Sequence, residues 1–235
     1  MSGLSQGQKH AFGPSGRVDA VCVSGVDLPS VPDRKPVRTG IDKKPVPGRV
    51  AVSPLGLDGD VQVNRRHHGG EGQALYAYGQ EDADFWAAEL GRDLPAGRFG
   101  ENLRTSGVDL TGALLGERWR VGTTLLEVTA PRTPCANFAR FWGLPDLVKR
   151  FAAHGATGAY LRVLELGDVA AGDAVDIVFR PGHGITTGLA FRALTTSRSR
   201  LPELAPALRY LPVKDQPKVA AKIEARLRTR SGARA

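Results

Sequence analysis

The fold is decided by residues 113–128, whose sequence is ALLGERWRVGTTLLEV. Short runs of aliphatic and aromatic residues alternate here with glycines, which is typical of consecutive strands joined by tight turns. We therefore expect turns at Gly116 and Gly122. The three strands around them are predicted over residues 113–115, 118–121 and 124–128.

Further strands and helices are predicted on both sides of this stretch. The strands cover residues 18–24, 49–52, 159–166 and 174–179, and the helices cover residues 81–90 and 144–153. The first helix begins with Glu-Asp-Ala-Asp, and acidic residues favour a helix N-terminus because they interact with the positive end of its dipole. Residues 29–47 are proline-rich and are expected to form loops, and residues 167–172 are expected to form a turn.

The pattern changes to short helices after Gly184. Three are predicted, over residues 187–194, 202–208 and 217–227, and the last carries apolar residues at helical spacing. The sequence thus predicts a disordered tail over residues 1–17, a β-rich domain over residues 18–182 and a small three-helix domain over residues 184–229.

The composition is that of an ordinary soluble globular protein, with 24% charged and 41% hydrophobic residues. No apolar run approaches the roughly 18 residues that a membrane-spanning helix needs, and the N-terminus has no apolar signal-peptide core. Two cysteines, Cys22 and Cys135, do not form a disulfide framework and cannot hold a four-thiolate iron–sulfur cluster. We therefore expect a cytoplasmic protein without a membrane anchor.

The positive charge is concentrated at the C-terminal end. Residues 184–235 contain 11 Lys and Arg against 3 acidic residues, whereas the rest of the chain contains 21 of each kind. Such a segment can contact nucleic acid, an acidic lipid surface or an acidic protein, or it can be a solvated face. The segment has no helix rich in Arg, Asn and Gln, which argues against nucleic acid as its partner.

Cys135 lies in the rigid segment Pro-Arg-Thr-Pro-Cys, residues 131–135. Proline restricts its own backbone and that of the preceding residue, so Pro131 and Pro134 fix the direction of the thiol. The nearby Arg132 favours the thiolate, which is the form that binds metals or attacks substrates. The alternative is an inert buried cysteine, which is the interpretation we give to Cys22 in its apolar strand.

Three glycine-centred clusters accompany this cysteine. Arg-Thr-Gly-Ile-Asp-Lys-Lys at residues 38–44 suits an anion such as phosphate, or forms an exposed loop. His-Gly-Gly at residues 68–70 lets backbone amides approach a ligand closely, or forms a turn. Arg-Phe-Gly-Glu-Asn-Leu at residues 98–103 can recognise a heterocycle edge or connect a helix to a strand. The histidines have no zinc-ligand spacing, so no zinc site is expected.

In this order, the motifs resemble those of the MOSC family, named after the C-terminal domain of molybdenum cofactor sulfurase. The matching segments are TGIDK at 39–43, GLDGDVQ at 56–62, HGG at 68–70, FGENL at 99–103 and PRTPC at 131–135. The chain is most similar to a bacterial single-domain branch that carries a small C-terminal helical domain and reduces N-hydroxylated compounds. The resemblance covers about residues 35–180 and, more loosely, the helical tail.

The resemblance implies an α+β fold: a mixed, mostly antiparallel β-barrel with peripheral helices and a small C-terminal helical appendage. It also implies a cleft for the molybdenum cofactor, molybdopterin with molybdenum. Cys135 would be the metal ligand, and Glu101 and His68 would be the candidate proton donors. The residues that would contact the cofactor are Thr39, Lys43, His68, Gly69, Gly70, Gly100, Asn102, Arg132 and Cys135. The doubled Lys43-Lys44 leaves two candidates for the phosphate contact.

The implied activity is a molybdenum-dependent reduction of N-hydroxylaminopurines, amidoximes or hydroxylamines. Since this chain has no iron–sulfur ligands, electrons would come from a separate flavin or ferredoxin-type protein, and the basic tail could dock an acidic donor. One alternative is a carrier of persulfide sulfur or of the cofactor, without reductase activity. A nucleic-acid-binding protein that uses the C-terminal helices is the other alternative.

Overall fold

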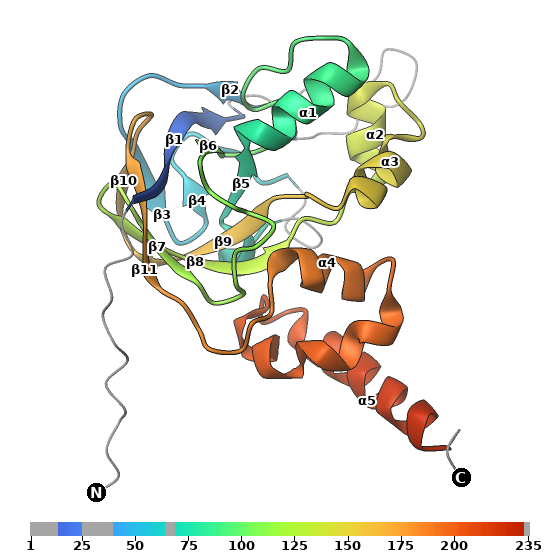
Figure 1. The fold of residues 1–235 in the computed structure, drawn as a ribbon. Helices are drawn as coiled ribbons and strands as arrows, with labels where there is room; N and C mark the ends of the chain where they lie inside the picture. The colour runs from blue at the N-terminus through green and yellow to red at the C-terminus, as the bar shows by residue number, and fades with distance from the viewer. Residues whose placement is uncertain (1–13, 25–39, 64–68, 233–235) are drawn as a thin grey trace, which may run out of the picture.

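The computed structural model describes residues 14–24, 40–63 and 69–232. Within them, seven strands close into a barrel, in the order β11-β7-β8-β9-β5-β6-β1, with β1 also paired to β11 (Figure 1). All neighbours are antiparallel except β5 and β6. The barrel strands are β1 (Pro14–Val23), β5 (Leu75–Gly79), β6 (Leu103–Ser106), β7 (Arg118–Val121), β8 (Thr124–Pro131), β9 (Ala159–Glu165) and β11 (Ala174–Phe179). The expected α+β barrel is confirmed.

Four short strands complete the described sheets. β2 (Lys44–Pro45) pairs with the end of β1, while β3 (Val50–Ser53), β4 (Gly56–Leu57) and β10 (Gly167–Val169) form a small separate sheet. The hairpin of β7 and β8 forms as expected, with Val121 opposite Thr124 and Gly122 in the left-handed region at φ 54°. Alternate residues of this hairpin point into the core, as the sequence pattern requires.

The parallel pair of β5 and β6 positions the cavity described below. β5 leads into α1 (Gln80–Leu90), which ends at Gly91 in the left-handed conformation. The chain then returns to β6, because parallel neighbours need a crossover. After β8, α2 (Ala136–Trp142) and α3 (Leu147–His154) follow. Together α1, α2 and α3 cover one side of the barrel (Figure 1) with a cluster of buried aromatic rings.

Several predicted boundaries were wrong. Residues 113–115 form no strand, since Leu114 makes only an isolated bridge to Thr186. Residues 167–169, expected in a turn, form β10, which pairs with β3. β1 begins at Pro14, so the predicted tail over 1–17 is too long, and its residues 1–13 lie outside the described part of the chain. β5, β6 and α2 were not predicted; β5 is buried at every position and so lacks the alternation that identifies a strand.

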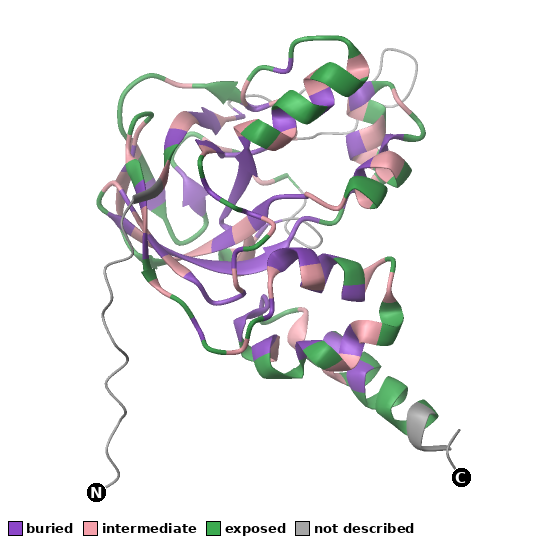
Figure 2. Ribbon diagram, viewed as in Figure 1, coloured by how far each residue is buried: buried purple, intermediate pink, exposed green. Residues whose placement is uncertain are grey.

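The C-terminal segment shares its core with the barrel. It contains α4 (Thr187–Leu194), the 3-10 stretch η2 (Arg198–Tyr210) and α5 (Gln216–Gly232). The predicted helix over 202–208 is part of a 3-10 stretch that contains Pro202 and Pro206, and proline disfavours the interior of an α-helix because its ring clashes with the carbonyl four residues earlier. Buried residues of α4 and η2 belong to the same cluster as those of β8, and Figure 2 shows burial continuing from the barrel into α4. Residue 184 therefore marks a change of secondary structure within one core.

No helix of the described residues is both long and apolar enough to cross a membrane.

The shared core predicts that barrel and appendage unfold together. Replacing Leu204, which is fully buried in η2, by Ala should lower the free energy of unfolding by about 2–5 kcal/mol in one cooperative transition. The control is Leu227→Ala, at a half-exposed position on α5. This substitution should change the free energy of unfolding by no more than about 0.5 kcal/mol. Calorimetry measures both. Two separate transitions would show that the appendage is an independent domain.

Candidate functional site

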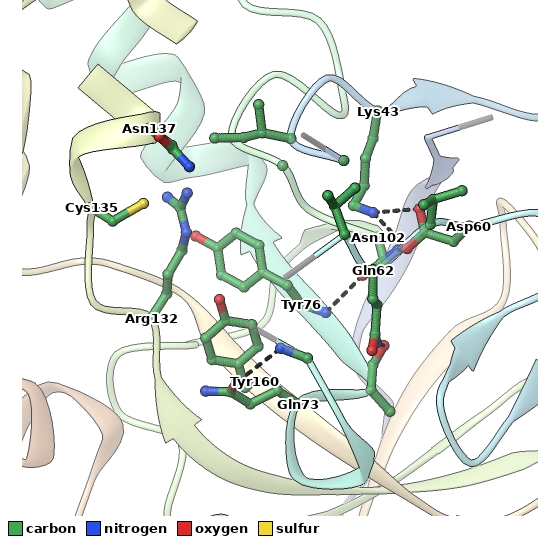
Figure 3. Close-up of a pocket in the computed structure, with 17 residues that line it drawn as sticks. Lys43, Asp60, Gln62, Gln73, Tyr76, Asn102, Arg132, Cys135, Asn137 and Tyr160 are labelled. Carbon is green, nitrogen blue, oxygen red and sulfur yellow. Dashed lines mark hydrogen bonds and ion pairs between the residues drawn. The ribbon is translucent and has the colours of Figure 1, made fainter. Parts of the chain in front are cut away.

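Motif residues that are far apart in the sequence surround one cavity beside the β5–β6 pair. The motif residues in its walls include Lys43, Gly69, Gly100, Asn102, Arg132 and Cys135. Figure 3 shows Cys135, Arg132 and Asn137 on one side and Lys43 with Asp60 on the other, with the rings of Tyr76 and Tyr160 between them. The fold therefore brings most of the predicted site residues to one place.

Cys135 occupies the turn between β8 and α2. It is the N-cap residue of α2, in an extended conformation at φ −128°, and its carbonyl accepts a hydrogen bond from the Phe138 amide at 3.0 Å. Its side chain does not cap the helix and lines the cavity. The thiol is half-buried, whereas Cys22 is fully buried in β1. The structure thus distinguishes an accessible cysteine from an inert one.

Arg132 brings a buried positive charge to the same wall. It is 6% exposed, its guanidinium lies 4.3 Å from the Phe138 ring centre and 5.2 Å from that of Tyr76, and its Nη1 has no hydrogen-bond partner. Among the described residues it forms no ion pair with a carboxylate. Burial raises the pKa of Tyr160, and the Arg132 charge opposes that rise. A cation in this position favours a thiolate at Cys135 and an anionic ligand beside it.

The opposite wall is a buried hydrogen-bond network. Lys43 Nζ lies 2.5 Å from both carboxylate oxygens of Asp60, and the two side chains are 8% and 4% exposed. Asp60 also accepts hydrogen bonds from the Ser24 amide and from Asn102 Nδ2, each at 2.8 Å. Lys44 pairs instead with Asp42 at 2.8 Å and is 68% exposed. Of the two adjacent lysines, Lys43 is therefore the one at the cavity.

Asn102 links three parts of the structure. Its Nδ2 donates to Asp60 and to the carbonyl of Cys22 at 3.2 Å, and its Oδ1 accepts from the Tyr76 amide at 3.1 Å. Both side-chain donors are used and the residue is 4% exposed. Asn102 thus shapes the cavity by holding its wall together.

Glu101 does not line the cavity, which contradicts its predicted role as a proton donor. It is fully buried, and its Oε1 accepts hydrogen bonds from the Gly97 amide at 2.8 Å and from Arg104 Nε at 2.9 Å. Its Oε2 accepts from the Phe99 amide at 2.9 Å. These contacts enclose the carboxylate and leave it no access to a substrate. Glu101 instead holds the loop that leads into β6.

Two glycines of the cavity wall have conformations or contacts that exclude a side chain. Gly69 has φ 112°, and a Cβ there would lie 2.4 Å from Gln62 Oε1. Gly100 has φ 79°, and a Cβ would lie 3.1 Å from Ile41 Cγ1. Gly70, at φ 81°, donates its amide to Gln62 Oε1 at 3.0 Å and begins the 3-10 turn η1 (Glu71–Gln73). Glycine is needed because side chains rarely adopt these φ values.

Two predicted residues, Thr39 and His68, lie outside the described part of the chain. The cavity is also lined by residues that no sequence motif indicates: Tyr76, Tyr160, Asn137 and Gln73. No local pattern identifies them, because the pairing of β5 with β9 places Tyr76 beside Tyr160, and the packing of α2 and η1 adds Asn137 and Gln73. Among the described residues, no three His, Cys, Asp or Glu side chains gather to hold a metal.

The cavity of the barrel is thus lined by a partly exposed cysteine, Cys135, and a buried arginine, Arg132. Residues 64–176 match the MOSC domain model. YflK of Bacillus subtilis is 34% identical over 160 residues, which are 68% of this chain and 72% of YflK. YiiM of Escherichia coli is 31% identical over 156 residues, which are 65% of this chain and 69% of YiiM. The chain therefore belongs to the MOSC domain family.

The solved structures agree with this assignment. The crystal structure of YiiM from Geobacillus stearothermophilus superposes with a TM-score of 0.72 at 27% identity, and covers 88% of this chain and 99% of its own. YiiM from Escherichia coli, at 23% identity and a TM-score of 0.69, supports the fold alone. A protein of Gibberella moniliformis named "Reductase" is 30% identical over 149 residues, which are 26% of that protein.

The Glu101 network predicts a large loss of stability on neutralisation. Glu101→Gln keeps the shape but leaves the buried Arg104 charge unpaired, so the free energy of unfolding should fall by about 3–5 kcal/mol. The control, Glu165→Gln, breaks the half-exposed pair with Arg120 and should cost less than about 1 kcal/mol. Urea unfolding measures both. Equal, small effects would mean that Glu101 is not a structural anchor.

The two cysteines should differ in reactivity. Burial, and then the charge of Glu101, raise the pKa of Cys22 to about 12, so only Cys135 should be alkylated by iodoacetamide at pH 8. Arg132→Met should raise the pH of half-maximal Cys135 alkylation, whereas Arg132→Lys, which keeps the charge, should raise it less. Mass spectrometry of alkylated peptides resolves the sites. Identical pH profiles in all three proteins would exclude the thiolate role of Arg132.

Proposed function

We propose that this protein is a molybdenum-cofactor-dependent reductase of N-hydroxylated compounds such as N-hydroxylaminopurines, amidoximes and hydroxylamines. Membership of the MOSC family supports it, as does the relative that carries the name "Reductase". The observation that carries the proposal is the accessible thiol of Cys135 beside the unpartnered, buried Nη1 of Arg132.

The residues present fit a molybdopterin group. A thiolate is a soft ligand and suits a soft, sulfur-bound metal, so Cys135 would be the protein ligand. Arg132 Nη1 lacks a partner and would donate to an anionic group of the ligand. Lys43 uses two N–H groups on Asp60 and retains one for a phosphate. A Cβ at Gly69 would meet Gln62 and one at Gly100 would meet Ile41, so these two glycines set the shape of the cavity wall.

When bound, the cofactor would supply the two electrons that, with two protons, convert an N–OH group into N–H and water. The side chains of this chain would bind and orient the substrate. The Tyr76 hydroxyl already donates to the Thr157 carbonyl at 2.8 Å. Of the two ring hydroxyls at this wall, that of Tyr160, whose pKa burial raises, would therefore be the one to donate a hydrogen bond to a ligand. Of the two predicted proton donors, Glu101 is excluded by its burial, and His68 stays a prediction.

Electrons must reach the site from outside the chain, because two cysteines cannot hold a four-thiolate iron–sulfur cluster. We therefore propose a separate flavin or ferredoxin-type donor protein.

The direct test is an assay of purified protein for molybdenum and for dithionite-driven reduction of a hydroxylaminopurine. Wild type should contain molybdenum and reduce the substrate, and Cys135→Ser should lose activity to background because the metal loses its protein ligand. Cys22→Ala is the matched cysteine control and should keep activity. Full activity of Cys135→Ser would disprove the proposed mechanism.

A further inference from the structure

The C-terminal segment reaches the glycine turn that forms one wall of the cavity. Lys214, between η2 and α5, donates from its Nζ to the carbonyl of Gly69 and to Gln73 Oε1, each at 3.0 Å. Gln73 Oε1 also accepts the Gly69 amide at 3.1 Å. One ammonium group thus joins both ends of the turn, and its two partners line the cavity while Lys214 itself does not.

A second contact fixes the same turn independently of charge. A Cβ at Gly72 would lie 2.7 Å from Pro212 Cβ and 2.9 Å from Pro212 Cα. The Gly72 backbone is not in the left-handed region, so the approach of Pro212 is what requires glycine. On the other side, Thr129 Oγ1 of β8 donates to the Gly72 carbonyl at 2.7 Å. The turn is therefore held between the barrel and the C-terminal segment.

The segment that carries Pro212 and Lys214 is itself firmly placed. Leu211 is 1% exposed and belongs to the main core. Gln216 Nε2 donates to the Leu211 carbonyl at 2.8 Å, and Arg162 of β9 donates to the Tyr210 carbonyl at 2.7 Å. Lys214 thus extends from a fixed backbone, which lowers the entropy cost of its two hydrogen bonds.

We propose that Lys214 is a positioning residue for the cavity: with the Gly72–Pro212 contact, it fixes the turn over residues 69–73 in the shape that the ligand requires. The C-terminal appendage would then complete the binding site from outside. This inference rests on the proposed function only for the identity of the ligand, molybdopterin.

The first test follows the turn without any ligand. Lys214→Met removes the hydrogen-bond donors but keeps the length of the side chain, whereas Lys214→Arg keeps both the donors and the charge. Lys218→Met is the matched control, because Lys218 is an exposed lysine on α5. Amide exchange of Gly69 and Gly70, measured by NMR, should accelerate by about tenfold in Lys214→Met and stay near wild type in the other two. The thermal midpoint should stay unchanged in all. Equal exchange rates in Lys214→Met and Lys218→Met would overturn the proposal.

The second test links the turn to the ligand. Molybdenum and pterin retained after dialysis should fall by about tenfold in Lys214→Met and return to the wild-type level in Lys214→Arg. Gly72→Ala, which displaces Pro212, should reproduce the faster exchange and the loss. If wild type contains molybdenum and pterin and Lys214→Met retains as much of both, the positioning role is contradicted. If wild type holds no pterin, the proposed function fails, and the exchange rates still decide the role of Lys214.

Discussion

The buried amide of Asn102 is the interaction on which the cavity depends. It joins the Cys22 carbonyl in β1, the Tyr76 amide in β5 and the carboxylate of Asp60, all with little access to water. Asp60 in turn holds Lys43. An unsatisfied polar group in such a place is costly, so these groups fix one another and the whole wall. The parallel pairing of β5 and β6 brings Asn102 to this position.

The reactive wall has a different origin. Cys135 and Arg132 follow β8, and the aromatic cluster of α1, α2 and α3 supports the Arg132 guanidinium through the Phe138 ring. One wall therefore has its charges paired between Lys43 and Asp60, while the other offers a thiol and a buried guanidinium whose Nη1 has no hydrogen-bond partner. This asymmetry is what makes the cavity suitable for an anionic ligand that also needs a soft donor.

Local signals predicted much of the fold and part of the site. The positions of the glycines predicted the hairpin of β7 and β8, and those of the prolines predicted the restricted backbone around Cys135. The role of Glu101 could not, because its motif does not show which way the carboxylate faces; Arg104, three residues later, was the available signal of an internal pair. The contact of Lys214 with Gly69 joins positions 145 residues apart, and only the packing of the appendage on the barrel creates it.

The central claim is that Cys135 binds the metal of a pterin cofactor. X-ray absorption at the molybdenum edge tests it most directly, since the spectrum counts the sulfur neighbours of the metal. If Cys135 binds the metal, the molybdenum in wild type has one sulfur neighbour more than the molybdenum retained by Cys135→Ser. An equal sulfur count in the two proteins, or a wild type without molybdenum, would contradict it.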